Sequence, residues 1–170
     1  MGRYTHDPTS VVAAIPIFPK DDYELKIGKP KPFERTARKG HQSYGIRFPM
    51  TAVGGMMDGK RTVFTIYLHS EGAQQMAKRF QMAVYGLKVN ERNEKEFDQW
   101  AHDKDWTYDP ESGELGEAWA EYEGKHVMVD LDIDLARDEV GQPLKDAEGN
   151  ETQQQTWGTW RPVAAVEAAV

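Results

Sequence analysis

The chain has no cysteine, which excludes disulfide bonds and metal sites built from thiolates. It also lacks a long apolar run. The short stretch from Val11 to Ile15 is followed by Pro16, whereas a membrane-spanning helix needs about 20 apolar residues. We therefore expect no contact with a membrane and a cytoplasmic location.

Motifs that carry nucleotide or metal chemistry are missing as well. There is no phosphate-binding loop of the form GxxxxGK, and no grouping of serine, histidine and aspartate of the kind that hydrolases use. The five histidines are scattered without the spacing of metal ligands, at positions 6, 41, 69, 102 and 126. These absences predict a protein that is not an enzyme and that binds neither a metal nor a cofactor.

The composition is that of one globular domain with long loops. The chain has 170 residues, of which 39% are hydrophobic and 29% are charged, and a domain of this length buries a core of its own. Prolines at positions 8, 16 and 19 indicate an irregular N-terminal arm over residues 1–20. We assign residues 21–163 to the domain, with an acidic insertion at about 88–124, and residues 164–170 to a C-terminal tail.

Alternation of apolar and polar residues predicts five strands. Residues 70–87 instead repeat their apolar side chains every three or four positions after Ser70, which is the pattern of a capped helix. The charged segment 90–106 is a candidate for a second helix. The expected strands cover about residues 22–27, with a continuation to Phe33 left open, then 44–50, 61–68, 126–136 and 152–163.

Three strands, a helix and two more strands follow the order of a five-stranded OB-like barrel, a mainly β fold with its helix between strands three and four. A curled α+β sheet has the same order and stays open as an alternative. The core is expected to hold the residues that share one face of each element: Tyr23, Leu25, Ile27, Ile46, Phe48, Phe64, Ile66, Leu68, Phe80, Val84, Val129, Leu131 and Ile133.

Positive charge is concentrated in residues 29–48, KPKPFERTARKGHQSYGIRF, although the chain as a whole has a net charge of −7. This stretch, which we call the basic segment, has Glu34 as its only acid. An acidic protein that binds nucleic acid must gather its cations in one place, because contacts with phosphates supply most of the non-specific affinity. A solvated loop whose charges bind nothing is the alternative interpretation.

Aromatic residues accompany these cations, both in the basic segment and on the third and fifth strands. The bases of a single strand stack on such rings whatever their identity, for about 1–3 kcal/mol each. In an OB-like barrel the basic segment falls in the loop between the first two strands, beside the surface that binds oligonucleotides. The candidate binding residues are Lys29, Lys31, Phe33, Arg35, Arg38, Lys39, Tyr44, Arg47, Arg61, Tyr67 and Trp157.

The stretch DDYELKIGKPKPFERTARKGHQSYGIRFPMTAVGGMMDGKRTVFTIYL precedes the expected helix, and EYEGKHVMVDLDI follows it. Over residues 21–133 this succession resembles the phage-encoded single-stranded DNA-binding proteins of the OB type. These share a Y-x-(V/L)-x-I strand, a turn rich in lysine or glycine, an F-x-V strand, a G-(K/R) turn and a late GK-x-V-x-V strand. The resemblance implies sequence-independent binding of single-stranded DNA for phage replication or recombination in the host cytoplasm. Replication or recombination proteins are then further partners, and homo-oligomerisation stays open.

Two other functions also stay open. One is a protein-interaction module of a replisome or virion, which would present three tryptophans to a partner: Trp100, Trp106 and Trp119. The other is a metal-dependent nuclease, because alternate carboxylates on a strand can hold Mg²⁺. We expect the aspartates concerned to form only the solvated face of the fourth strand and to bind no metal: Asp130, Asp132 and Asp134.

Overall fold

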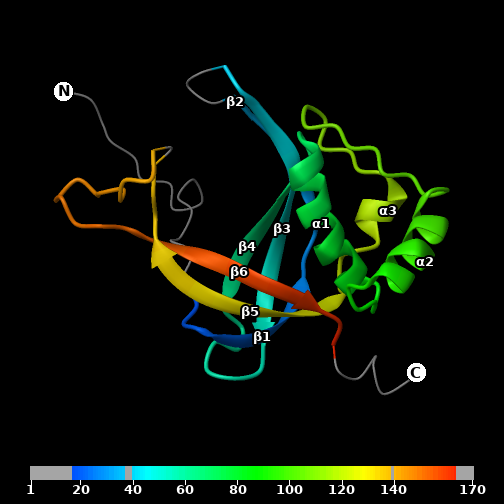
Figure 1. Cartoon of the computed structure of the whole chain (residues 1–170), viewed down its shortest axis with the longest axis horizontal. Coiled ribbons are helices and arrows are strands. Elements are labelled where there is room, and N and C mark those ends of the chain that lie inside the picture. The colour runs from blue at the N-terminus through cyan, green and yellow to red at the C-terminus, as the bar shows by residue number, and fades with distance from the viewer. Residues whose placement is uncertain (1–16, 37–39, 139, 164–170) are drawn as a thin grey trace, which may run out of the picture.

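The computed structural model describes residues 17–36, 40–138 and 140–163, and the chain runs mainly through antiparallel strands (Figure 1). Within these residues six strands and three helices follow one another. They are β1 (Asp21–Ile27), β2 (Lys31–Thr36), β3 (Gln42–Val53), β4 (Arg61–Tyr67), α1 (Glu71–Val84), α2 (Glu91–Ala101), α3 (Glu117–Ala120), β5 (His126–Leu135) and β6 (Gln153–Arg161).

β3 holds the sheet together because it is long enough to pair with two strands along one edge. Its first residues, Gln42 to Arg47, pair with β2, and its last residues, Met50 to Val53, pair with β1. β4 also pairs with β3, while β5 lies between β1 and β6. All these ladders are antiparallel, and the strand order is β2-β3-β1-β5-β6 with β4 beside β3.

From the OB order we expected the basic segment to lie in the loop between the first two strands and at the start of the second strand, but most of its described residues belong to β2 and β3. β1 and β2 are separated only by Gly28 to Pro30 and continue in the same direction. Both therefore run antiparallel to β3. The basic segment therefore supplies β2 and the first half of β3. Among the described strands β2 pairs with β3 alone, so no second ladder there needs the N–H that Pro32 lacks.

The sheet is not closed into a barrel. Within the described residues no ladder joins β4 to β6, so the structure is an antiparallel sheet of six strands rather than the five-stranded barrel that we predicted. Side chains nevertheless fill the space between these two strands, because the rings of Phe64 on β4 and Trp160 on β6 lie 4.5 Å apart. The OB-like arrangement thus stays a prediction.

The core lies between the sheet and α1. Ser70 begins the helix by accepting a hydrogen bond from the N–H of Ala73, and the helix buries Ala77 and Phe80 against the strands. Of the residues predicted for the core, all but Ile133 are buried or pack against the buried cluster. Ile133 is half-buried in the part of β5 that leads into the β5–β6 hairpin.

The acidic insertion and the end of the N-terminal arm contribute to this core. Residues 88–124 form α2, α3 and the segment between them, and they bury Trp119 and Tyr122. Phe18 is fully buried, and the side chain of Gln155 bonds both its N–H and its C=O, at 2.6 and 3.0 Å. Residues 1–16 and 164–170, which include most of the predicted arm and the whole predicted tail, lie outside the described residues.

Candidate nucleic-acid interface

The register of β2, β3 and β4 gathers several predicted binding residues on one face of the sheet. Residues that stand directly opposite one another in paired strands project from the same face. Lys31, Arg47 and Thr65 form one row across the three strands, and Phe33, Gly45 and Tyr67 form the next row. Arg35 opposite Ser43 continues the same face. We call this surface the β2–β3–β4 face.

Gly45 allows the two aromatic rings of the middle row to meet. It has no side chain between Phe33 and Tyr67, whose ring centroids lie 5.7 Å apart in an edge-to-face arrangement. A Cβ atom at this position would also overlap the carbonyl oxygen of Ile66 on β4. Glycine is therefore required for the close approach of β3 and β4 and for the contact between the rings.

The two rings differ in what they offer to a ligand. Phe33 is only 8% exposed, because the guanidinium of Arg47 lies 4.6 Å from its ring centroid and Tyr67 covers its edge. Tyr67 is 39% exposed. The ring of Tyr67 is therefore accessible to a base. The buried ring of Phe33 instead packs against Tyr67 and Arg47 and holds them in place.

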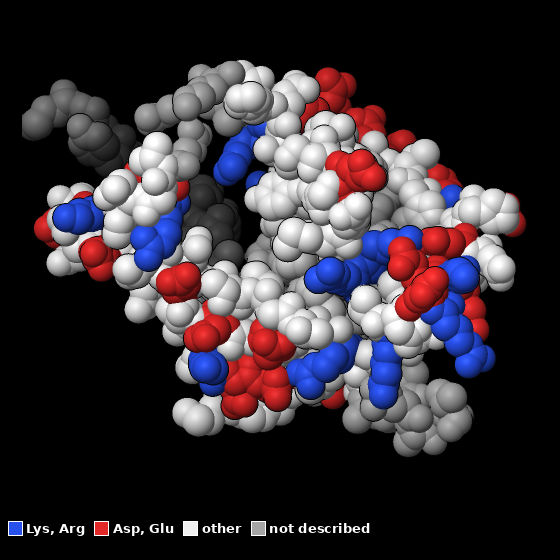
Figure 2. Space-filling view, viewed as in Figure 1, with Lys and Arg blue, Asp and Glu red and all other residues white. Residues whose placement is uncertain are grey.

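The cations of the β2–β3–β4 face are exposed and form no ion pair with a described carboxylate: Lys31, Arg35 and Arg47. On α1 and α2, by contrast, Lys78 pairs with Glu94 and Asp98, and Lys95 pairs with Glu91. Cations without a carboxylate partner keep their full charge for an incoming anion. In Figure 2 basic side chains border the upper rim of a hollow between the body of the molecule and the projecting β5–β6 hairpin.

Beyond this face two carboxylates of β1 contact basic side chains of the neighbouring strands. On β1 Glu24 lies 2.9 Å from the ring Nδ1 of His126 on β5, and Asp22 accepts a hydrogen bond from Arg161 on β6 at 2.8 Å. Exposed Lys26 on β1 and exposed Arg61 on β4 both stand opposite Thr51 of β3, so cations also lie beyond this face.

The remaining cations of the candidate list are placed differently. Lys29 is exposed in the connection between β1 and β2. Arg61 is exposed at the far end of β4, six residues from Tyr67 and hence about 20 Å away along the strand. Arg38 and Lys39 lie outside the described residues.

Tyr44 does not join the row of Phe33 and Tyr67, because it projects from the opposite face of β3. Its ring lies 6.0 Å from His69 and 6.4 Å from Tyr108, and His69 lies 5.7 Å from Tyr67. Burial and then the neighbouring Tyr44 raise the pKa of Tyr108. The sequence pattern gave no sign of His69 or Tyr108, since only the fold brings residue 108 beside β3.

Trp157 borders the β2–β3–β4 face from the other side of β4. It stacks on Trp160 with centroids 5.6 Å apart and packs beside Phe64. Together with Tyr67 it lines a pocket of about 430 Å³ between β4, α1 and β6, which also includes Arg79. The structure therefore places Tyr67 and Trp157 on two sides of one groove.

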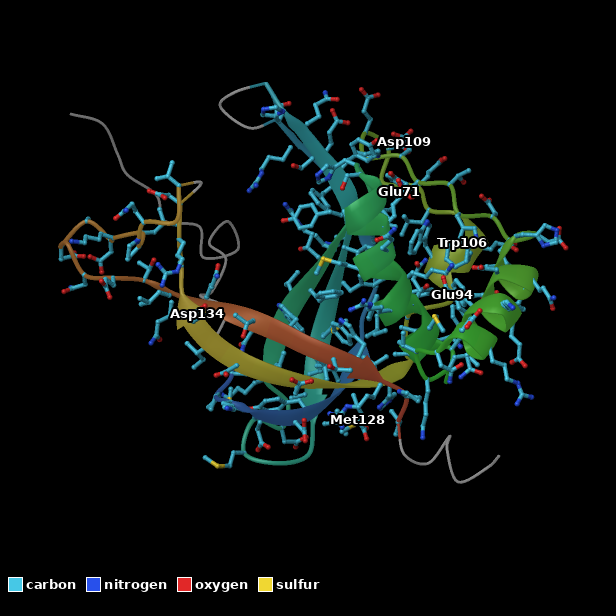
Figure 3. The ribbon with its side chains drawn as sticks, in the orientation of Figure 1. Glu71, Glu94, Trp106, Asp109, Met128 and Asp134 are labelled. Atoms are coloured by element: carbon cyan, nitrogen blue, oxygen red, sulfur yellow. The ribbon has the colours of Figure 1, made fainter. Side chains whose placement is uncertain are left out.

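The alternate aspartates of β5 are exposed, as predicted, and their carboxylates accept hydrogen bonds from the backbone. Asp130 accepts from the N–H of Thr159, and Asp134 accepts from the N–H of Leu135 where β5 enters the hairpin (Figure 3). Within the described residues no three acidic or histidine side chains are grouped so that they could hold a metal ion.

The three tryptophans of the interaction-module hypothesis are not presented to solvent together. Trp119 is 2% exposed, and its indole N–H donates to the carbonyl oxygen of Trp106 at 2.7 Å. Trp106 in turn donates to the carbonyl oxygen of Ala101, and Trp100 lies under Lys104. Trp119 thus lies in the core of the insertion, and Trp100 and Trp106 are half-buried, so the three rings do not form one exposed surface.

No protein-family model matches the chain, and neither does any curated protein. Within residues 17–36, 40–138 and 140–163, no helix has both the length and the apolar character needed to cross a membrane.

Proposed function

We propose that the protein binds single-stranded DNA without sequence preference on the β2–β3–β4 face. One observation carries the proposal: Tyr67 is exposed in the middle row of a face on which Lys31, Arg35 and Arg47 have no described carboxylate partner. An exposed ring with cations on both sides suits a strand whose phosphates follow the cations while a base stacks on the ring.

Single strands suit this face better than duplexes. The bases of a duplex are already stacked on one another and leave no free surface for Tyr67, whereas those of a single strand do. Stacking on a ring is insensitive to base identity, because every base has a flat π face. Binding through phosphates and one ring therefore predicts little sequence preference.

The succession of strands and the position of α1 support an OB-like arrangement, in which strands two and three carry the oligonucleotide. β3 and β4 have these positions if β1 and β2 count as one interrupted strand. With the resemblance to phage single-stranded DNA-binding proteins, this arrangement leads us to propose a non-catalytic role in phage replication or recombination in the host cytoplasm. Replication or recombination proteins are then the partners.

The proposal is tested by removing the cations of the face. The variant with Lys31, Arg35 and Arg47 all changed to Gln is titrated with fluorescent oligo(dT) at several salt concentrations, next to the unchanged protein. Since a single strand releases about 0.7 counterion per neutralised phosphate, we expect the slope of log K against log salt to flatten by about two.

A matched control removes the same charge elsewhere. Arg92, Lys95 and Lys104 are exposed in or just after α2 and are changed to Gln together. This control should keep the slope and the affinity of the unchanged protein within about a factor of two. Equal losses in both variants would mean that net charge alone attracts the strand, and an unaltered first variant would mean that the strand does not bind this face.

A further inference from the structure

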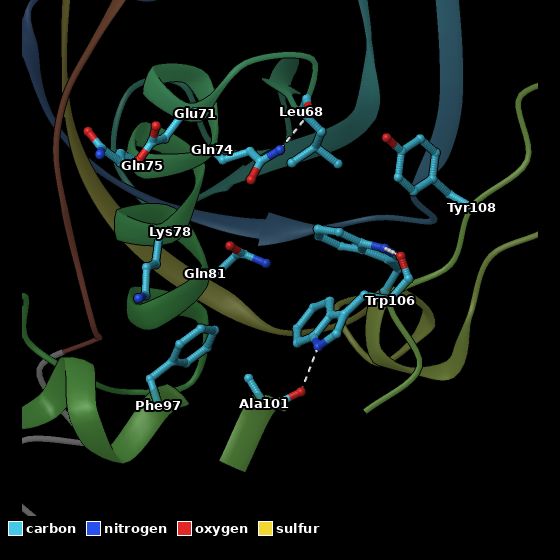
Figure 4. Close-up of a pocket in the computed structure, with 11 residues that line it drawn as sticks. Leu68, Glu71, Gln74, Gln75, Lys78, Gln81, Phe97, Ala101, Trp106 and Tyr108 are labelled. Atoms are coloured by element: carbon cyan, nitrogen blue, oxygen red, sulfur yellow. Dashed lines mark hydrogen bonds between the residues drawn. The ribbon is translucent and has the colours of Figure 1, made fainter. Parts of the chain in front are cut away.

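A second pocket, of about 460 Å³, lies between α1, α2 and the segment 106–119 (Figure 4). Pockets of roughly 300–1,000 Å³ hold small organic ligands. One of its walls is aromatic, with Phe97 from α2 and Trp106 and Tyr108 from the following segment. The other wall is α1, which contributes mostly polar side chains.

The aromatic wall is formed in advance of any ligand. The indole N–H of Trp106 donates to the carbonyl oxygen of Ala101 at 2.8 Å, and Trp119 holds the backbone of Trp106 through its own N–H. The rings of Trp106 and Trp119 meet edge to face with centroids 4.8 Å apart. A flat ligand that stacks on Trp106 therefore meets a ring that is already fixed.

The polar wall offers amides opposite that ring. Gln81 projects from α1 toward Trp106, whereas Gln74 lines the pocket with its amide directed to Leu68 (Figure 4). The amide nitrogen of Gln74 donates to the carbonyl oxygen of Leu68 at 2.9 Å, which leaves its oxygen as an acceptor. Behind Gln81 lies the buried hydroxyl of Tyr122, next to the side chains of Gln81 and Tyr85, and burial raises its pKa.

Charge in the pocket disfavours a phosphate. Lys78 is the one cation among the lining residues, and it is held by Asp98 at 2.7 Å and Glu94 at 3.1 Å. Burial works against the charge of Lys78, but the hydrogen bonds to these two carboxylates raise its pKa. Glu71 adds a negative charge at the start of α1. An uncharged ligand is therefore preferred.

A path of aromatic rings leads from the β2–β3–β4 face to this pocket. Tyr67 touches His69, His69 touches Tyr44, and Tyr44 touches Tyr108 of the pocket wall, with centroids 5.7, 6.0 and 6.4 Å apart. Leu68, which also lines the pocket, directly follows Tyr67. These contacts connect the face with the pocket around the end of β4.

We propose that this pocket takes one unstacked nucleobase of the bound single strand. The base stacks on Trp106, and its polar edge meets the amides of Gln74 and Gln81, since both amides offer the donors and acceptors that base edges need. This inference rests on the proposed function, because the strand on the β2–β3–β4 face delivers the base.

The test uses the shortest oligo(dT) that the full chain binds with undiminished affinity, so that the strand has one register. A single abasic nucleotide is placed at each position in turn, and 2-aminopurine replaces the same base to report stacking through its fluorescence. Besides the position that Tyr67→Ala identifies, we expect a second position at which base removal weakens binding about tenfold and 2-aminopurine is strongly quenched.

Two pocket variants assign that second position. Gln74→Met combined with Gln81→Met keeps the volume of the side chains but removes the amides, and Ala101→Phe fills the pocket from α2. With each of these two pocket variants, removal of the base at the second position should no longer weaken binding. The salt dependence of the affinity for oligo(dT) should stay unchanged. Gln99→Met, the same substitution at an exposed position of α2 outside this pocket, should change neither. Circular dichroism of every variant confirms that it folds.

The outcomes separate the inference from the proposed function. If the unchanged protein binds oligo(dT) but no position responds to the pocket variants, the pocket holds no base and the proposed function stands. If it binds no single strand at all, both are wrong. A peptide that shifts the NMR signal of the Trp106 indole N–H, where bound oligonucleotide does not, would assign the pocket to a protein partner and overturn the inference.

Discussion

At the scale of single residues, Gly45 determines whether the candidate interface exists. It is the one member of its row without a side chain, and the rings of Phe33 and Tyr67 meet beside it. The guanidinium of Arg47 then covers the ring of Phe33. A buried ring thus holds an exposed ring and a cation in fixed positions, which lowers the entropy that binding must remove.

Gly45→Ala is expected to destabilise the protein by about 2–3 kcal/mol, because the new Cβ atom overlaps the carbonyl oxygen of Ile66 and β3 and β4 must separate. Urea unfolding measures the change. Gly72→Ala is the control of opposite sign: Gly72 lies in α1 with open space around it, so alanine should stabilise by about 0.5 kcal/mol. Equal stability of Gly45→Ala and the unchanged protein would show that the strands are not packed closely here.

Tyr67→Ala is expected to weaken the binding of oligo(dT) at least about fivefold at every salt concentration, because it removes one stacked ring and no charge. Fluorescence anisotropy measures the affinity. Tyr67→Phe keeps the ring and should bind as the unchanged protein does. A loss that is as large for Tyr67→Phe would mean that the hydroxyl, rather than the ring, contacts the strand.

At the scale of elements, the segment from Asp105 to Gly116 positions Trp106 in the pocket wall and Tyr108 beside Tyr44. Asp105 accepts hydrogen bonds from the hydroxyl and the N–H of Thr107, at 2.6 and 3.0 Å, and Asp109 accepts from the N–H of Glu111. These bonds fix the turns of a segment that has little regular structure. The pocket wall and the contact of Tyr108 with Tyr44 depend on them.

This segment should loosen in acid. Hydrogen bonds from Thr107 lower the pKa of Asp105, and those from Glu111 and Ser112 lower the pKa of Asp109. A lowered pKa in the folded state stabilises the fold above the unfolded pKa, and this contribution is lost as the pH falls through the folded value. We expect the NMR signal of the Trp106 indole N–H to shift over that range.

The variant Asp105→Asn has no carboxylate at this position. Its Trp106 indole N–H signal should already be partly shifted at neutral pH, and this signal should change less when the pH is lowered. Asp138→Asn is a matched control, because Asp138 also accepts hydrogen bonds from loop N–H groups but lies in the distant β5–β6 hairpin. An indole signal that does not change with pH in either form would show that these carboxylates do not hold the segment.

At the scale of the whole molecule, the two strands that no ladder joins are held together by rings. Phe64 of β4 contacts Trp157 and Trp160 of β6, and Phe80 of α1 contacts both Phe64 and Trp160. Within the described residues β4 pairs only with β3, and β6 only with β5. Side-chain packing therefore does what hydrogen bonds would do in a closed barrel.

Trp160→Ala should consequently destabilise the protein by about 3–5 kcal/mol, because it leaves a cavity between β4, β6 and α1. Urea unfolding measures this loss. Met76→Ala, at a position of α1 that is 72% exposed, should change stability by less than about 0.5 kcal/mol. A loss below about 1 kcal/mol for Trp160→Ala would show that β4 and β6 are held independently of one another.

The sequence by itself predicted most of the elements and the faces that they bury. The alternation of apolar residues predicted β1, β4 and β5 closely, because one face of each strand packs against the core while the other meets water. Ser70 predicted the start of α1 for an equally local reason, a side chain that bonds the first turn. The concentration of cations in residues 29–48 is likewise a property of the sequence.

Only the tertiary structure decided how those residues meet. The register of β2 and β4 on β3 placed Phe33 beside Tyr67, and register depends on pairing partners that are distant in the chain. The alternation leaves the continuation of the first strand to Phe33 open, and the rest of β2 was not predicted because Pro32 and the charged residues hide its alternation. Tyr108 reached Tyr44 because the insertion folds back against α1, a long-range packing that no local pattern contains.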